Sequence, residues 1–303
     1  MNPKILVIIV TYNWVKWAKN VSEWINNSSI KLDTIIIDNG SNDNTVESYE
    51  KNLNNIVKVV RNECNLWFWW ANNIWLEYAI KHNYDYVYLL NQDARFFNDT
   101  IEKLINICKR NPNVWIISPF QCWSSLKKID KNFQVNVCWF ESNKDIFSDI
   151  YFNNEKELYE VSWVMAAHWL LPIKTIKKVW WFSPTFFHYW EDDNYINRVK
   201  YFWYGIYISP HIDVIHDRYN REDTEDKKMY ILYTSSLNLL SNPLEKELKN
   251  LLKIFVYSVY YSLYYNSFKP IINLFKILKN YHKIKNNKKI SMCKNTPFLK
   301  IDS

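Results

Sequence analysis

The hydrophobic pattern of the first half of the chain alternates between two periods. A continuous apolar run rich in Ile and Val predicts a strand buried on both faces at 4–11, and further apolar runs predict strands at 34–38, 56–61, 84–90 and 114–118. Apolar residues at helical spacing between these runs predict helices at 15–27, 45–52, 71–82 and 98–110. This alternation predicts an α/β fold whose mostly parallel sheet has helices on both faces.

The pattern changes after residue 118. The pattern of residues 119–160 is less regular, which predicts a variable excursion of the chain away from the regular α/β order. Beyond them we expect helices at 172–179 and 191–202, short strands at 206–209 and 214–215, and then only helices, at 227–241, 244–264 and 268–283. Residues 284–303 are expected to be poorly ordered. The sequence therefore predicts an α/β domain at 1–226 and a helical, basic extension at 227–303.

Polar residues follow three of the predicted parallel strands. Thr11, Tyr12 and Asn13 end the first strand, Asp38 ends the second, and Asp93 follows the strand at 84–90. Ligands of open α/β sheets bind beyond the carboxyl ends of the strands. A carboxylate at Asp93 is costly there unless it is paired or holds a cation, and Mg²⁺ with phosphate ligands needs only one or two protein carboxylates. The alternatives are a helix-capping Asp93 and a turn-forming Asp38.

Three acids, Glu191, Asp192 and Asp193, lie at a predicted helix N-terminus. The helix dipole favours ionised carboxylates at this end, so one of them could accept a proton as a general base. The alternative is a cluster that only caps the helix. His188 precedes these acids and His216 ends a strand. Each is a candidate for ligand contact, with a structural role as the alternative.

The composition is anomalous in two residue types. The 303 residues include 16 Trp and 2 Gly, whereas about 7% Gly is usual. With Gly in place of each Trp, the stretch 65–75 reads NLGFGGANNIG, a loop that lets backbone N–H groups approach a phosphate closely. Trp180 and Trp181 follow a predicted helix. The residue after a helix often adopts the left-handed backbone conformation, which favours Gly. We hypothesise that most of these Trp are UGA codons that the source organism reads as glycine. A Trp-rich protein is the alternative.

The net charge of +7 is concentrated in the tail. Lysines there outnumber acids, which suits an anionic membrane surface or an anionic ligand, with a solvated basic tail as the alternative. Nucleic acid is not an expected partner. The tail lysines are Lys276, Lys279, Lys283, Lys285, Lys288 and Lys289.

The five cysteines, at 64, 108, 122, 138 and 293, form no CxxC pair. Their odd number and spacing favour reduced thiols over a disulfide framework or a zinc site. The apolar run at 5–10 is too short for a secretory signal, and no run reaches the length of a membrane span. We therefore expect a cytoplasmic protein, placed at the inner membrane face if the tail binds lipid.

Five motifs, taken in order, resemble family 2 glycosyltransferases, most of all their rhamnosyltransferase-type members. They are IIVTYN at 8–13, DNGS at 38–41, NLWFWWAN at 65–72, LNQD at 90–93 and FHYWEDD at 187–193, and the resemblance extends over about 4–218. Trp17 and Trp169 match Trp in the family. Members carry Gly at ten other positions, namely Trp14, Trp67, Trp69, Trp70, Trp75, Trp115, Trp180, Trp181, Trp190 and Trp203.

The resemblance implies a glycosyltransferase A-type fold and inverting transfer of a sugar, rhamnose being the first candidate. The donor would be a nucleotide sugar and the acceptor a glycan or a lipid-linked glycan in cell-surface polysaccharide synthesis. A divalent cation, Mg²⁺ or Mn²⁺, would be held by Asp93 with His216. The DxD-like element reads Asn91-Gln92-Asp93 and lacks its first acid, which puts the strength of metal binding in question.

The resemblance also assigns the remaining site residues. Asp192 would be the catalytic base, with Glu191 as second choice. The acceptor would be contacted by His188 and Asp193. Nucleotide-sugar binding would fall to Thr11, Tyr12, Asn13, Asp38, Asn72 and Gln92.

Two other functions stay open on the sequence alone. A nucleotidyltransferase also uses an α/β sheet and metal-binding acids, but the basic, glycine-rich triphosphate loop expected early in such a chain is not visible. A non-catalytic sugar-binding or scaffold protein becomes the better interpretation if the Trp residues are real, because indoles would fill the donor pocket and offer stacking surfaces.

Overall fold

The structure is a computed structural model that describes residues 3–63, 68–137, 143, 145–186, 188–217 and 224–293, with only the backbone course at 68–71. The chain divides into two compact units. The first comprises Met1–Lys177 and Trp203–Tyr219, and the second Lys178–Phe202 and Asn220–Ser303. Residues 178–202 thus group with the C-terminal helices. The single domain boundary at 226 stays a prediction.

Nine strands of the described residues form one sheet in the first unit, in the order β3-β2-β1-β4-β8-β6-β9-β5, with β7 paired to β9. The strands are β1 Ile5–Thr11, β2 Asp33–Asp38, β3 Ile56–Arg61, β4 Tyr86–Asn91, β5 Ala94–Phe96, β6 Val114–Cys122, β7 Tyr159–Glu160, β8 His168–Pro172 and β9 Gly205–His216. The sheet is mixed and its central part is mostly parallel, as the sequence predicts.

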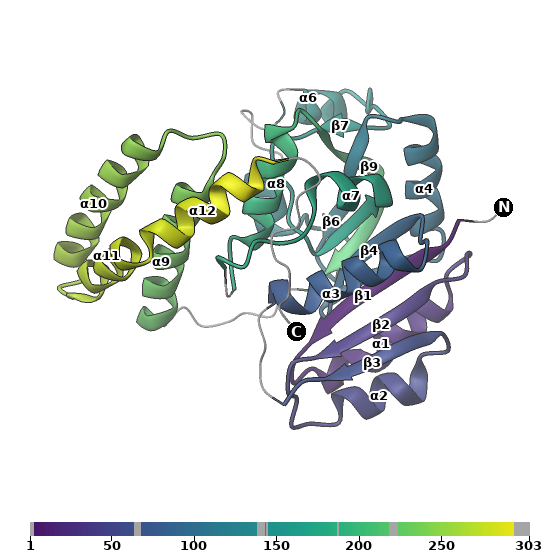
Figure 1. The fold of residues 1–303 in the computed structure, drawn as a ribbon. Coiled ribbons are helices and arrows are strands. Elements are labelled where there is room, and N and C mark those ends of the chain that lie inside the picture. The colour runs from purple at the N-terminus through teal and green to yellow at the C-terminus, as the bar shows by residue number, and fades with distance from the viewer. Residues whose placement is uncertain are drawn as a thin grey trace. The chain divides into compact units, whose positions relative to one another are not determined.

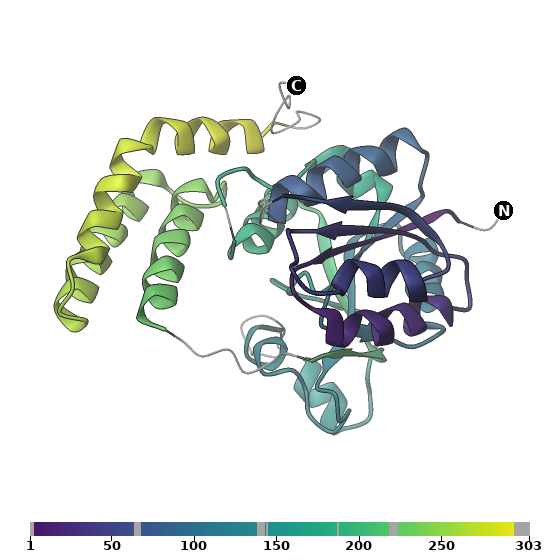
Figure 2. The same cartoon turned by 90° about the horizontal axis from the view of Figure 1, so that it is seen from below.

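The parallel half, β3-β2-β1-β4, aligns the carboxyl ends of its strands at one edge. Val10 of β1 lies opposite Ile37 of β2 on one side and Asn91 of β4 on the other. The interior of β1 and β2 is almost wholly apolar because helices cover both faces, α1 and α2 one face and α3 the other (Figures 1 and 2). The helices of the first unit are α1 Val15–Asn26, α2 Thr45–Asn52, α3 Phe68–Lys81, α4 Thr100–Arg110, α5 Lys131–Val137, α6 Ile146–Tyr151 and α7 Ile173–Val179.

The other half of the sheet is built from strands far apart in sequence. β8 lies antiparallel between β4 and β6, and β6 pairs in parallel with β9. β5 pairs antiparallel with the end of β9, which sets Ala94 opposite His216. This pairing brings the segment that follows β4 to His216, the last residue of the last strand.

The second unit is helical. Its helices are α8 Glu191–Tyr201, α9 Glu225–Ser241, α10 Glu247–Tyr264, α11 Lys269–Lys279 and α12 Tyr281–Ser291. Thr224 caps α9 by accepting a hydrogen bond from the backbone N–H of Lys227 (3.3 Å), and Pro270 lies in the first turn of α11, where its missing N–H costs nothing. The apolar core of this unit comprises Phe186, Leu237, Leu240, Ile254, Leu274, Ile277 and Ile284.

Several predicted elements differ from the observed ones. The helix expected at 71–82 begins at Phe68, and the strands expected at 206–209 and 214–215 are one strand, β9. The helix expected at 268–283 ends at Lys279 and a new helix begins at Tyr281. The expectation of poor order from 284 is wrong up to Ser291, because Ile284 is buried in the helical core and α12 packs against α9.

Candidate active site

Polar side chains tie together the carboxyl ends of β1 and β4 in the first unit. The hydroxyl of Thr11 and the backbone N–H of Tyr12 both donate to Oε1 of Gln92, at 3.0 and 2.8 Å. The register that places Val10 beside Asn91 makes these bonds possible. The side chain of Tyr12 is 44% exposed. Three of the predicted nucleotide-binding residues therefore lie together, and one of them offers an accessible aromatic ring.

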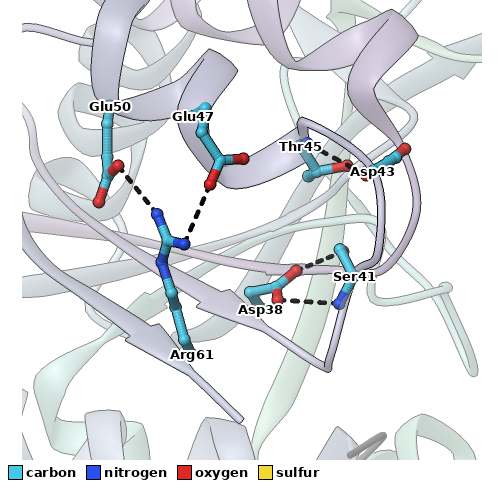
Figure 3. A network of polar contacts seen from close by, with 7 residues as sticks. All are labelled: Asp38, Ser41, Asp43, Thr45, Glu47, Glu50 and Arg61. Atoms are coloured by element: carbon cyan, nitrogen blue, oxygen red, sulfur yellow. Dashed lines mark hydrogen bonds and ion pairs between the residues drawn. The ribbon is translucent and has the colours of Figure 1, made fainter. Parts of the chain in front are cut away.

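Asp38 ends β2 at the same edge and organises the turn that follows (Figure 3). Its carboxylate accepts hydrogen bonds from the backbone N–H of Ser41 (2.9 Å) and from the Ser41 hydroxyl. The Ser41 hydroxyl in turn accepts from the backbone N–H of Asn13 (2.8 Å), and Oδ1 of Asn13 accepts from that of Asn42 (2.9 Å). Asp38 thus forms the turn that the sequence left as an alternative. Its contact with a nucleotide stays a prediction.

A second set of bonds stabilises the loops around this turn (Figure 3). Asp43 accepts from the backbone N–H of Thr45 (3.1 Å), from the Thr45 hydroxyl and from the backbone N–H of Val15 (3.2 Å), so it joins the starts of α1 and α2. Arg61, at the end of β3, pairs with Glu47 and Glu50 of α2, each at 3.0 Å. The loops after β1 and β2 are therefore held by their own polar side chains.

Asp93 and His216 meet because β5 pairs with β9. Nε2 of His216 lies 3.6 Å from Oδ1 of Asp93, and the backbone N–H of Asp217 donates to the carbonyl of Asp93 (2.9 Å). The side chain of Asp93 is 12% exposed and that of His216 is 3% exposed. The predicted metal-binding pair is thus in one place, with the carboxylate as the more accessible of the two.

Sequence reasoning missed Asp130, which lies on the other side of His216. Oδ2 of Asp130 is 3.9 Å from Nδ1 of His216, and Oδ1 accepts the backbone N–H of Phe133 (2.9 Å) at the start of α5. Asp130 lies in the stretch predicted to be irregular. The available signal was an Asp directly before a short apolar-periodic segment, which is a helix-capping pattern.

Asp93 and His216 supply too few ligands to hold a divalent cation alone, so ligands from outside the protein would have to complete the coordination shell. Among the described residues no group of three or more His, Cys, Asp and Glu could hold a metal on its own. A carboxylate oxygen suits Mg²⁺ or Mn²⁺ when water and phosphate oxygens supply the other ligands, and an imidazole nitrogen suits Mn²⁺ better than Mg²⁺. The donor set is therefore compatible with a cation that arrives with a diphosphate.

A neighbouring histidine is held neutral. His168 of β8 is buried, and its burial, followed by the proximity of His216, lowers its pKa to about 3. Its Nε2 lies 3.1 Å from the carbonyl of Ile215, which can only accept, so Nε2 carries the proton. Nδ1 then accepts from the hydroxyl of Tyr88 (2.8 Å). The hydrogen bonds of His168 thus join β4, β8 and β9 next to His216, and the neutral ring adds no charge there.

The three acids at the start of α8 belong to the second unit and differ in environment. Oδ1 of Asp192 accepts the backbone N–H of Asp193 (2.9 Å), and both side chains are partly exposed. Glu191 is buried, and burial, together with the nearby carboxylate of Asp192, raises its pKa to about 8. For Glu191, burial outweighs the effect of the helix dipole, which favours the ionised form. A mostly protonated carboxyl is a poor base, so Asp192 is the better candidate.

The pH dependence of stability should reveal this burial. Glu191 ionises near 4.5 when unfolded but near 8 when folded, so between these values the folded state keeps a proton that the unfolded state has lost. The free energy of unfolding should therefore fall, relative to that of Glu191→Gln, as the pH rises from about 4.5 to about 8. Urea titrations of both proteins across this window measure the difference. Parallel pH profiles would contradict the assignment.

Two other residues of the second unit, Arg198 and His188, make defined contacts. The guanidinium of Arg198 donates to the backbone carbonyls of Val179 (2.9 Å) and Trp181 (2.6 Å), which joins α8 to the segment after α7. The ring of His188, a predicted acceptor residue, lies 4.1 Å from that of Tyr189. Asn72, predicted to bind the donor, is buried in α3 of the first unit.

Three of the Trp that match Gly in the family have left-handed backbone conformations. The φ angles of Trp180, Trp190 and Trp203 are 63°, 72° and 62°. A bulky residue rarely adopts these values, whereas Gly does so freely. Trp115 lies at a register shift between β6 and β9, another place where Gly is common. Trp67 lies outside the described residues.

Comparison with known proteins gives two kinds of match. The model of the family described as "Glycosyl transferase family 2" matches residues 6–167. The crystal structure of S. aureus TarS superposes with a TM-score of 0.54 at 13% identity, covering 82% of this chain and 41% of that one. The structure of S. aureus TarS 1–349 gives the same TM-score, identity and coverage of this chain, and 68% of its own length is covered. No curated protein matches.

These matches agree with the geometry of the first unit. The chain spans less than half of the longer TarS chain, and at this identity the superposition shows the fold alone. That fold is the glycosyltransferase A type, with a mixed, mostly parallel sheet. The family match covers more than half of the 303 residues and includes the ends of β1, β2 and β4, but not α8. Members of this family commonly depend on a divalent cation. The chain therefore belongs to glycosyl transferase family 2.

Proposed function

We propose that this protein is an inverting hexosyltransferase that moves a sugar, rhamnose as first choice, from a nucleotide-sugar donor to a glycan or lipid-linked acceptor in cell-surface polysaccharide synthesis. The observation that carries the proposal is the convergence of Thr11, Gln92, Asp38 and Asp93 at one edge of the parallel strands. In sheets of this kind nucleotides bind at that edge. The family membership supports glycosyl transfer as the reaction class.

The first unit would bind the donor. Tyr12 offers its exposed ring to the base, while Asn13 and Asp38 shape the loop around the nucleoside. Asp93 and His216 would hold Mg²⁺ or Mn²⁺ against the diphosphate. When bound, such a cation neutralises the charge that develops on the departing nucleoside diphosphate.

Asp192 is the proposed general base. Asp192 would accept the proton of the acceptor hydroxyl as that oxygen attacks the anomeric carbon on the face opposite the nucleotide. An electrophile with oxocarbenium character lets the proton leave late, so a carboxylate can serve as the base. His188 and Asp193 are the proposed acceptor contacts. A single displacement of this kind inverts the anomeric configuration.

We place the protein in the cytoplasm, at the inner face of the membrane. Two buried thiols support a reducing compartment, because Cys108 and Cys122 are free in the structure. Burial raises the pKa of both to about 12, so they are unreactive core residues and not a redox pair.

A donor screen tests the proposed function. The form with Gly at the ten family positions is incubated with dTDP-rhamnose, UDP-sugars and GDP-sugars, with Mg²⁺ or Mn²⁺, and nucleotide release is measured. We expect one donor to be turned over, and Asp93→Ala to lower the rate by about 10²–10³ because it removes the charged ligand at the diphosphate. Asp99→Ala, an exposed Asp at the start of α4, is the matched control and should keep the activity.

The outcomes of this screen separate the alternatives. Donor binding without turnover would favour a sugar-binding protein, and consumption of a nucleoside triphosphate with release of pyrophosphate would favour a nucleotidyltransferase. Near-normal turnover in Asp93→Ala would remove Asp93 from the site. Retention of the anomeric configuration in the product would overturn the single displacement.

A further inference from the structure

The outward face of α10 is apolar along its whole length. Six large side chains at helical spacing form what we call the α10 row, and its ends are the most exposed, with Leu248 at 81% and Leu263 at 78%. A soluble helix normally presents its polar residues to water on this face. The α10 row comprises Leu248, Leu252, Phe255, Val256, Val259 and Leu263.

The inward face of the same helix carries polar residues. Asn250 and Ser258 are buried there beside Ile254, and the amide of Asn250 donates to the backbone carbonyl of Leu239 in α9 (2.6 Å). α10 therefore buries polar side chains while it leaves large apolar ones exposed. An apolar row of this size marks an interaction surface.

Charge distinguishes the possible occupants of this surface. Residues 248–301 contain eleven Lys and no Asp or Glu. Lys249 and Lys253 lie on α10 beside the α10 row, and α11 exposes Lys276 and Lys279 next to the apolar side chain of Phe275. This combination of an apolar face with flanking lysines is typical of helices that lie in a membrane interface.

A second copy of the chain fits the same surface less well. A two-fold interface uses one patch on both subunits, so the lysines of each copy would face those of the other, while the acid of α10, Glu247, already pairs with Lys285 (3.2 Å). Anionic lipid headgroups would neutralise these lysines while the acyl region receives the apolar side chains. Among the described helices none is long and apolar enough to cross a membrane, so the contact would be peripheral.

We propose that the α10 row, together with Lys249 and Lys253 of α10 and the exposed Lys276 and Lys279 of α11, docks on an anionic lipid surface. The α10 row enters the headgroup boundary and the lysines contact the headgroups. This deepens the proposed location at the membrane face, but it does not depend on which sugar is transferred.

Flotation of the full chain with vesicles tests the proposal. Wild-type protein should float with vesicles that contain phosphatidylglycerol and remain unbound with phosphatidylcholine alone. The variant Leu248→Gln/Leu252→Gln/Leu263→Gln should bind the anionic vesicles about tenfold more weakly or less still, because it removes the most exposed apolar area. Lys249→Gln/Lys253→Gln should weaken binding by about fivefold per Lys, and added salt should weaken wild-type binding.

A matched control replaces three exposed apolar side chains of the first unit by Gln. Val135→Gln/Phe147→Gln/Tyr151→Gln alters three exposed apolar residues of the first unit and should float like wild type. Circular dichroism checks that each variant is folded. Nucleotide release from the donor, measured without vesicles, should be unchanged in all of them, which separates this test from that of the proposed function.

Two results would overturn the proposal. One is wild-type protein that does not float with anionic vesicles. The other is sedimentation showing a wild-type dimer that the α10-row variant converts to a monomer while flotation is the same for both, which would assign the surface to a second copy.

Discussion

Replacing Trp180, Trp190 and Trp203 by glycine is expected to raise the free energy of unfolding by roughly 3 kcal/mol or more. Each of these residues has a φ between 62° and 72°, and a residue with a side chain costs about 1–2 kcal/mol in this region. Trp203 gives the clearest single test, because its side chain is 96% exposed and its removal sacrifices almost no packing. Trp190 packs partly against the helical core, so its gain will be smaller. Urea unfolding with linear extrapolation measures each change.

The matched control is a Trp that the resemblance marks as genuine. Trp169 is fully buried in β8, and Trp169→Gly should lower the free energy of unfolding by about 3–5 kcal/mol because it leaves a large cavity. Stability that falls in Trp203→Gly would argue for a real indole there. The same hypothesis requires that natural protein has glycine at these positions, which an intact mass or peptide sequencing decides.

Changing Asp192 to Asn should lower the turnover number by about 10²–10⁴ with little change in the donor KM. The substitution keeps the shape of the side chain and its acceptance of the Asp193 backbone N–H, but it removes the proton acceptor. Glu191 is a poor substitute, since its raised pKa leaves it mostly protonated at neutral pH. Steady-state kinetics with the preferred donor, at saturating acceptor, measure the loss.

The neighbouring acid provides the comparison. Asp193→Asn, one residue along α8, should change mainly the KM for the acceptor, because Asp193 is proposed to contact it and not to take its proton. A turnover number close to wild type in Asp192→Asn would remove Asp192 from the chemistry. An equal loss in both variants would indicate a shared role of the two carboxylates.

The sequence predicted best those strands and site residues whose position depends on a single physical signal. β1 and β2 lie within a residue of their predicted bounds because a buried parallel strand is a continuous apolar run. The convergence of Thr11, Asp38 and Asp93 followed from the shared carboxyl edge of parallel strands. β5 could not be found in this way, since three residues are too few for any periodicity, and β8 lies next to an irregular segment.

Parts of the site that depend on distant contacts were not predictable. Asp130 faces His216 across 86 positions of sequence, and nothing local to either residue indicates the other. The burial of Glu191 was likewise hidden, because acids in the first turn of a helix are usually exposed. These are effects of tertiary packing, which a pattern along one chain does not record.

The order in which the chain builds the two units limits how the protein can be truncated. The polypeptide passes from one unit to the other three times, after Lys177, after Phe202 and after Tyr219. Removing everything beyond residue 177 would delete β9, the partner of β5, β6 and β7, and with it His216. Neither unit is thus one continuous segment of the chain, and an exchange of the second unit between relatives would have to join the chain correctly at all three crossings.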